Sequence, residues 1–153
     1  SYRSKVNIKL KNYFVVLILI SLIVGCASSS KKETDFYDLE VEKFSSSVKS
    51  LLTDLEFLKK ETLKVNANKP SIQRILIEAD NLWMKKDLKK ASSALERGLR
   101  IAKDESALYL RLAHLRLEQG LIKESSAFAE RGLLNKNASS WELLLLKIYS
   151  LQK

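Results

Sequence analysis

The 153-residue chain has one cysteine, one histidine, one proline and four glycines. A single cysteine, Cys26, excludes an internal disulfide bond, and a single histidine, His114, leaves no pair with the spacing of metal ligands. No glycine-rich phosphate loop follows a predicted strand, so we expect no enzymatic activity, no catalytic residue and no metal site. The scarcity of glycine and proline favours long helices over a turn-rich β architecture.

Basic residues exceed acidic ones, but only mildly beyond the N-terminus. The formal net charge is +9, from 27 basic and 18 acidic residues. Arg3, Lys5, Lys9 and Lys11 precede an apolar run, and setting these four aside leaves 23 basic against 18 acidic residues. This excess suits weak attraction to anionic lipid or to a cell-wall polymer. It is too diffuse to indicate nucleic acid.

The longest hydrophobic run lies near the N-terminus. Residues 13–24 follow the basic start and are almost entirely apolar. A run of about a dozen residues suits the hydrophobic part of a secretory signal peptide and is shorter than the ~20 residues that a spanning helix needs. We therefore predict a signal peptide over residues 1–25. The alternative is an N-terminal anchor helix with an incidental cysteine.

The run ends Ile23-Val24-Gly25-Cys26 and is followed by Ala27. This sequence resembles the lipobox of bacterial lipoproteins. The resemblance implies cleavage before Cys26, with diacylglycerol on its thiol, an acyl chain on its amino group and no other cofactor. Two or three acyl chains give stable membrane attachment, whereas one chain binds only marginally.

The residues after the lipobox bear on location. In enterobacterial lipoproteins an aspartate after the cysteine retains the protein in the inner membrane, so Ala27 implies the outer membrane, facing the periplasm. Residues 26–35 are small and polar beyond the cysteine, and we predict that they form a flexible tether.

An amphipathic helix is predicted over residues 36–66. Its apolar residues recur at alternating spacings of four and three, at Tyr37, Val41, Phe44, Val48, Leu51, Leu55 and Leu58. The stripe either packs on the rest of the chain or pairs with another copy as a coiled coil. We favour packing within the chain, because the serines at 45–47 and the lack of complementary charges weaken the coiled-coil interpretation.

An internal repeat follows. Residues 91–99 align with residues 125–133, and this offset equals the period of the tetratricopeptide repeat, about 34 residues. The second unit resembles that family through Tyr109, Leu112, Ala113 and Gly120, whereas the first has Lys86 at the position of the turn glycine. Glycine inside a helix costs about 0.5–1 kcal/mol, so its recurrence at Gly98 and Gly132 suggests a packing need.

The predicted fold is therefore all-α, with about two tetratricopeptide-like helical hairpins over residues 72–137. The long N-terminal helix flanks them on one side. A strongly apolar helix over residues 139–153, begun by Ser139 or Ser140, is predicted to cap the other side. The apolar character of that last helix reflects either burial or a docking patch.

Function is expected to come from a binding surface. In the family that the repeats resemble, the first helix of each hairpin lines a groove that accepts peptides or helices. The matching positions here are Leu76, Asp80, Trp83, Met84, Leu110, Arg111, His114 and Leu117. Trp83 is predicted either as the main binding residue of this groove or as a core tryptophan between the hairpins.

The lipobox, tether, repeats and late Trp141 together resemble short repeat lipoproteins that activate a bifunctional peptidoglycan synthase, a class A penicillin-binding protein. This implies a non-catalytic adaptor that binds a periplasmic protein, with no nucleic acid and no small-molecule substrate. Two alternatives stay open. One is a pilotin-like factor that escorts a secretin or pilus subunit, and the other is a self-associating envelope spacer.

Overall fold

The computed structural model describes residues 43–152. Over that range the chain is helical and contains no strand, which confirms the all-α prediction. None of the helices in this range combines the length and the apolar character needed to cross a bilayer. The predicted signal peptide, Cys26, the tether and the start of the helix predicted over 36–66 lie outside the described residues.

The helices follow one another with short connections. Residues 43–53 are helical, and after them come α3 (Leu55–Leu63), α4 (Pro70–Met84), α5 (Leu88–Ile101), α6 (Ser106–Glu118), α7 (Ile122–Leu133) and α8 (Ser140–Ser150). The chain divides into two compact units, Ser1–Ser46 and Ser47–Lys153. The hydrophobic core of the described residues runs from Leu51 to Tyr149, so the second unit contains it entirely.

The helix predicted over residues 36–66 is wrong as a single element, because Asp54 interrupts it. Asp54 has an extended backbone, with φ −123° and ψ 104°. Its side chain accepts hydrogen bonds from the backbone N–H groups of Glu56 and Phe57, at 3.0 and 3.2 Å, and so caps α3. An aspartate offers the chain this local cap in place of a continuous helix. Beyond the break, α3 ends at Leu63.

The two hairpins turn at equivalent positions. α4 ends at Met84 and α6 at Glu118, while α5 begins at Leu88 and α7 at Ile122, so both pairs of boundaries are separated by the same offset as the sequence repeat. Within each turn one residue has a left-handed backbone, namely Lys86 with φ 63° and Gly120 with φ 75°.

Gly98 and Gly132 lie where helices approach closely. A Cβ added to Gly98 would lie 2.8 Å from Leu108 Cδ2, and one added to Gly132 would lie 2.8 Å from Leu146 Cδ2 and 2.9 Å from Tyr109 Cβ. Real Cβ atoms essentially never come this near to another heavy atom. The packing need predicted for both glycines is therefore confirmed.

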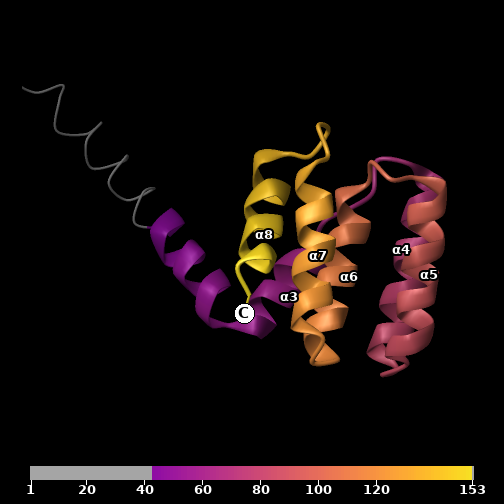
Figure 1. Ribbon diagram of the computed structural model, residues 1–153, viewed down its shortest axis with the longest axis horizontal. Coiled ribbons are helices and arrows are strands. Elements are labelled where there is room, and N and C mark those ends of the chain that lie inside the picture. The colour runs from indigo at the N-terminus through magenta and orange to yellow at the C-terminus, as the bar shows by residue number, and fades with distance from the viewer. Residues whose placement is uncertain (1–42, 153) are drawn as a thin grey trace, which may run out of the picture. The chain divides into compact units, whose positions relative to one another are not determined.

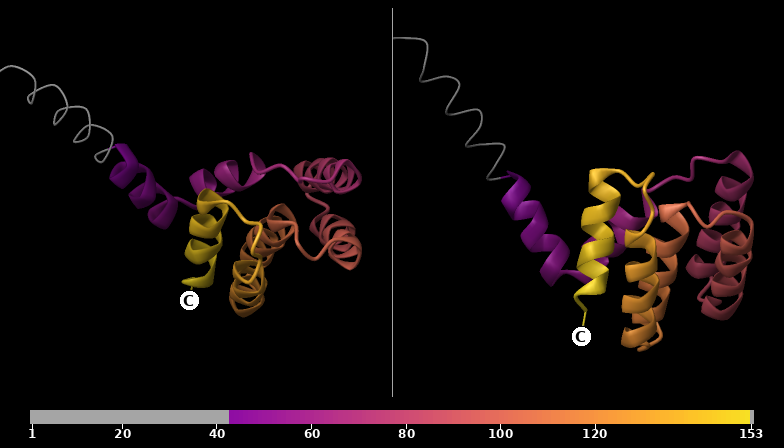
Figure 2. Two further views of the ribbon diagram at one scale, coloured as in Figure 1. Left: turned by 90° about the horizontal axis from the view of Figure 1, so that it is seen from above. Right: turned by 45° about the horizontal axis from the view of Figure 1, so that its top comes forward.

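α6 has the most neighbours within residues 47–152. It packs against α5 and α7, which flank it in the chain, and against α8 and α3. Figure 1 shows the helices from α4 to α8 standing side by side, each in contact with the next. Seen from above in Figure 2, α3 lies on the side of α6 away from α7. A capping box formed by Ser139 and Glu142 begins α8, so of the two predicted caps, Ser139 and Ser140, the first is the one observed.

Candidate functional site

The side of α4 and α6 that was predicted to form an open groove is occupied by the chain itself. α3 packs on α6 at this side, and its Leu58 and Thr62 are fully buried. The segment after α3, residues 64–69, then leads directly into α4. α3 thus holds the place that a ligand helix would take in an empty groove of this kind.

Arg111 of α6 holds the end of α3. Its guanidinium makes a bidentate ion pair with Asp80, through Nε to Oδ1 at 2.8 Å and Nη2 to Oδ2 at 3.0 Å. The same group donates to the backbone carbonyls of Val65 at 2.9 Å and Leu63 at 3.1 Å. These carbonyls lie at the C-terminal end of α3, where orphan acceptors and the helix dipole favour a cation. Because the Arg111 side chain is only 1% exposed, these partners are what permit its burial.

Glu105 holds the next part of the segment. Its two carboxylate oxygens accept hydrogen bonds from the backbone N–H groups of Asn68 and Lys69, both at 2.9 Å. Gln73 accepts from the N–H of Ala67 at 2.7 Å. Glu105 is 2% exposed, so this link belongs to the interior. The connection between α3 and α4 is therefore fixed by side chains from α4 and from the start of α6.

A second polar cluster joins α3, α6 and α8. The Tyr149 hydroxyl lies 2.7 Å from His114 Nδ1 and 2.7 Å from Thr62 Oγ1, within hydrogen-bond distance of both. The His114 and Tyr149 rings meet edge to face at 5.7 Å. Burial lowers the pKa of His114 to about 4, against a smaller opposing effect of Glu118, so the ring is neutral near pH 7. Burial likewise raises the pKa of Tyr149.

Glu118 connects this cluster to Trp83. One Glu118 carboxylate oxygen accepts from the indole N–H of Trp83 at 2.7 Å, and the other lies 2.7 Å from the Lys59 ammonium. The Lys59 ammonium also lies 4.9 Å from the centre of the Trp83 ring, a cation–π contact. Partial burial favours the neutral form of Glu118, but the hydrogen bonds from Lys59 and Trp83 outweigh it and lower the pKa of Glu118.

The predicted groove residues are of three kinds in the structure: buried, partly buried and exposed. Leu76 and Leu110 are fully buried core residues, and Trp83, Arg111 and His114 are buried beneath α3. Because all five are buried, they do not line an open groove in the described residues, and the burial of Trp83 agrees with the alternative of a core tryptophan. Leu117 is partly buried against the core. Asp80 is half-buried. Met84 is 74% exposed, and together with Lys59 and Trp83 it lines a pocket of about 280 Å³.

Four residues of this site were not predicted from the sequence: Lys59, Thr62, Glu105 and Tyr149. A buried glutamate at the N-cap of α6 and a tyrosine in an apolar helix carry no distinctive spacing. A weak signal was present at Thr62, which lies four residues after Leu58 and so on the same face of α3. The polar partners become recognisable only when α3 is placed against α6.

The arrangement holds the α3 segment through buried polar contacts. In the stretch from 43 to 152, no group of His, Cys, Asp and Glu residues could hold a metal ion. The polar groups at the site are engaged with one another or with the backbone of the α3 segment. Cys26, the predicted lipidation site, lies before the described residues. No protein-family model, no curated protein and no solved structure matches the chain.

Proposed function

We propose that this chain is an outer-membrane lipoprotein that acts as a protein-binding adaptor built on two tetratricopeptide-like repeats. The observation that carries the adaptor role is the equivalence of the two hairpins. Their turns are spaced by the same offset as the sequence repeat, and Gly98 and Gly132 lie at matching close contacts. Stacked hairpins of this kind act by presenting surfaces to other proteins. Ile23-Val24-Gly25-Cys26 supports the anchor.

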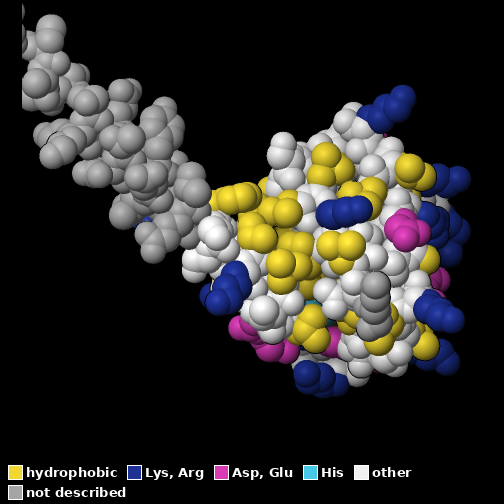
Figure 3. Space-filling model, turned by 60° about the vertical axis from the view of Figure 1, so that its left-hand side comes forward, with side chains coloured by type: hydrophobic (Ala, Val, Ile, Leu, Met, Phe, Trp, Pro, Cys, Tyr) yellow, Lys and Arg dark blue, Asp and Glu magenta, His cyan; other side chains and the backbone are white. Residues whose placement is uncertain are grey.

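An exposed hydrophobic face offers a docking surface outside the filled groove. Leu52, Leu55 and Leu151 are 54%, 52% and 55% exposed, and Trp141 at the start of α8 is 36% exposed. Figure 3 shows hydrophobic side chains gathered on the face that contains α8. Clustered exposed hydrophobic side chains mark protein contact sites more often than isolated ones do. A partner therefore binds at α8 without displacing α3.

The partner that we propose is a bifunctional peptidoglycan synthase of the class A penicillin-binding proteins. This part of the proposal depends on the resemblance of the lipobox, tether and repeats to lipoproteins that activate such synthases. A secretin or pilus subunit and a second copy of the chain are the competing partners. All three are distinguishable by the same experiment.

The test is site-specific photocrosslinking in intact cells. A photoreactive residue replaces Leu151 in the full chain, and a matched variant carries it at Lys123, an exposed position of α7. We expect an adduct with a peptidoglycan synthase from position 151 and none from position 123. An adduct with a secretin, or with a second copy of the chain, would show that this protein is the partner and that the synthase is not. No adduct at 151, when the variant is expressed and folded, contradicts the adaptor role of this face.

A further inference from the structure

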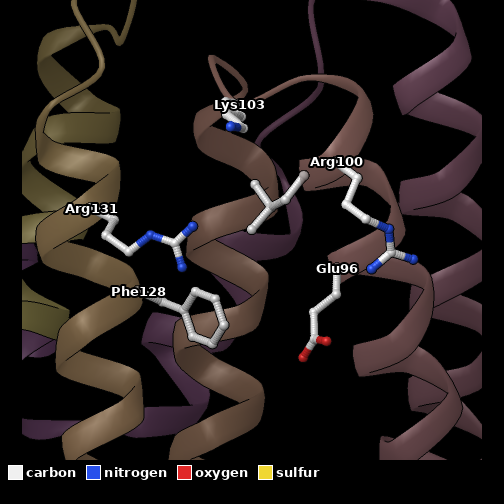
Figure 4. Close-up of a pocket in the computed structure, with 6 residues that line it drawn as sticks. Glu96, Arg100, Lys103, Phe128 and Arg131 are labelled. Carbon is white, nitrogen blue, oxygen red and sulfur yellow. The ribbon is translucent and has the colours of Figure 1, made fainter.

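Two adjoining pockets lie on the side of the molecule formed by α5 and α7. One has a volume of about 340 Å³ and is lined by Arg100, Lys103, Arg131 and Phe128 among others. The other, of about 510 Å³, shares Lys103 and Arg131 and adds Lys136. In Figure 4, Phe128 and Arg131 extend from α7 toward α5, which carries Arg100 and Glu96. The two pockets together bring four cationic side chains to one end of this pair of helices.

In the part of the chain that the structure describes, carboxylates do not neutralise these cations. Within residues 43–152, Arg100, Lys103, Arg131 and Lys136 form no ion pair. The Arg131 guanidinium instead makes cation–π contacts, 5.6 Å from the centre of the Phe128 ring and 5.8 Å from that of Tyr109. Such contacts bring no negative charge to the guanidinium.

The two carboxylates that line the pockets already have partners. Glu96 lies 2.7 Å from Arg116, which comes from α6. Asp104 lies 3.1 Å from the Lys69 ammonium. The end of α5 and α7 that bears the pockets therefore presents an excess of positive charge.

Two exposed aliphatic side chains accompany this charge. Ile101, the last residue of α5, is 62% exposed, and Leu134, just after α7, is 80% exposed. Leu134 lines the second pocket, and Ile101 is adjacent in sequence to Arg100. Cations surrounding exposed aliphatic side chains are the pattern of a surface that rests on a bilayer, with headgroups at the cations and the aliphatic groups at the acyl boundary.

We infer that the end of α5 and α7 bearing Arg100, Ile101, Lys103, Arg131, Leu134 and Lys136 is a docking surface for an anionic lipid bilayer. An acidic protein would also match the cations, but the proposed lipid anchor keeps a bilayer, and not a particular acidic protein, within reach of this surface. The inference rests on the proposed function in one respect, namely that an anchored domain has a membrane within reach. Docking would fix the orientation of the domain on the membrane and leave the hydrophobic face at α8 free for its partner.

The test uses residues 47–153, which form one compact unit with the whole core of the described residues, so we expect them to fold without the leader, and circular dichroism checks that they do. Because this part lacks Cys26, its result does not depend on lipidation. Its binding is measured by flotation with phosphatidylcholine vesicles that contain about one-third phosphatidylglycerol, and with vesicles of phosphatidylcholine alone. We expect binding to the anionic vesicles only, weakening as salt is raised.

The decisive variants are R100Q/K103Q and the matched pair K85Q/K89Q. Each double variant removes two positive charges from exposed side chains. Lys85 and Lys89 lie near the start of α5, whereas Arg100 and Lys103 lie near its end, and Lys89 is about 17 Å from Arg100 along the helix. We expect R100Q/K103Q to weaken binding about tenfold or more, and K85Q/K89Q to change it less than about twofold.

Aliphatic insertion is tested separately with I101S/L134S, which keeps every charge. We expect this variant to bind anionic vesicles more weakly than the unmodified domain does, and to bind soluble polyglutamate equally well. An equal loss in both charge variants would overturn the inference, because binding would then reflect net charge alone. If the domain bound polyglutamate more tightly than anionic vesicles, the occupant of this surface would be an acidic protein and the inference would be wrong. Circular dichroism melting of each variant excludes unfolding as the cause.

Discussion

Lys86 and Gly120 occupy the same position in successive hairpin turns, one repeat period apart, and both have a left-handed backbone. Glycine adopts this conformation without strain, but a lysine does not. We expect Lys86→Gly to stabilise the domain by about 0.5–1 kcal/mol, because relief of strain exceeds the entropy that glycine loses on folding.

The reciprocal change at Gly120 provides the control. Apart from the two neighbours of Gly120 in the chain, no heavy atom lies within 4 Å of a Cβ built there, so Gly120→Ala tests the backbone conformation. We expect it to destabilise by about 1 kcal/mol, and Lys85→Gly, where φ is −79°, to give no gain. Urea denaturation of the three variants measures these differences. A loss of stability in Lys86→Gly would show that the turn is not strained.

Removing the Asp80 carboxylate should be costly, because the buried Arg111 guanidinium would lose its charged partner. We expect Asp80→Asn to destabilise by about 2–3 kcal/mol, at the low end for a broken buried pair since Asp80 is 27% exposed. The carbonyls of Leu63 and Val65 remain as partners of Arg111. A double-mutant cycle with Arg111→Met, followed by denaturant unfolding, measures the coupling. A coupling near zero would mean that the pair does not hold the α3 segment.

Trp83→Ala is expected to destabilise the whole domain and not merely to weaken partner binding. The Trp83 side chain is 2% exposed and its N–H is bonded to Glu118, so truncation leaves a cavity and an unpaired carboxylate oxygen. We expect a loss of about 3–5 kcal/mol, measured by thermal unfolding. Trp83→Phe keeps most of the volume and should cost clearly less. An unchanged melting temperature in Trp83→Ala would restore the groove interpretation of this residue.

The stability of the domain should fall in mild acid because of His114. Its pKa is about 4 in the folded chain, below the ordinary value of 6.5, so the unfolded chain binds a proton first as the pH falls. The contribution is fully present above pH 6.5 and is lost as the pH drops toward 4, by on the order of 3 kcal/mol.

Denaturant unfolding between pH 7 and pH 4 measures this effect, and the His114→Gln variant is its control. The slope of stability against pH between 6.5 and 4 should become smaller in the variant. An NMR titration of His114 with an ordinary midpoint, near 6.5, would contradict the burial that we describe for its ring.

Two features of the hairpins could be predicted because the evidence for them is local. The offset between the two units and the need for glycine at 98 and 132 follow from residue types and spacing, whereas the turns at Lys86 and Gly120 were expected from the resemblance to the tetratricopeptide repeat. The Ser139 cap is equally local, since Glu142 lies three residues later in the same turn.

The position of α3 could not be predicted in the same way. The regular apolar stripe continues on both sides of Asp54 and so predicts one continuous helix. Only the folded chain shows that the helix is interrupted at Asp54, which caps α3. Arg111 was predicted as a residue of an open groove, but it is buried. Its burial depends on Asp80 and on carbonyls 46 and 48 residues away, a tertiary relationship that sequence spacing does not reveal.

The membrane anchor is tested most directly by labelling cells with radioactive palmitate and measuring the mass of the mature chain by mass spectrometry. We expect label to enter the wild-type protein and not Cys26→Ser. We also expect the mature protein to begin at Cys26, with a mass increased by its acyl chains. A wild-type chain that remains unlabelled, or that retains residues 1–25, would contradict the lipid anchor.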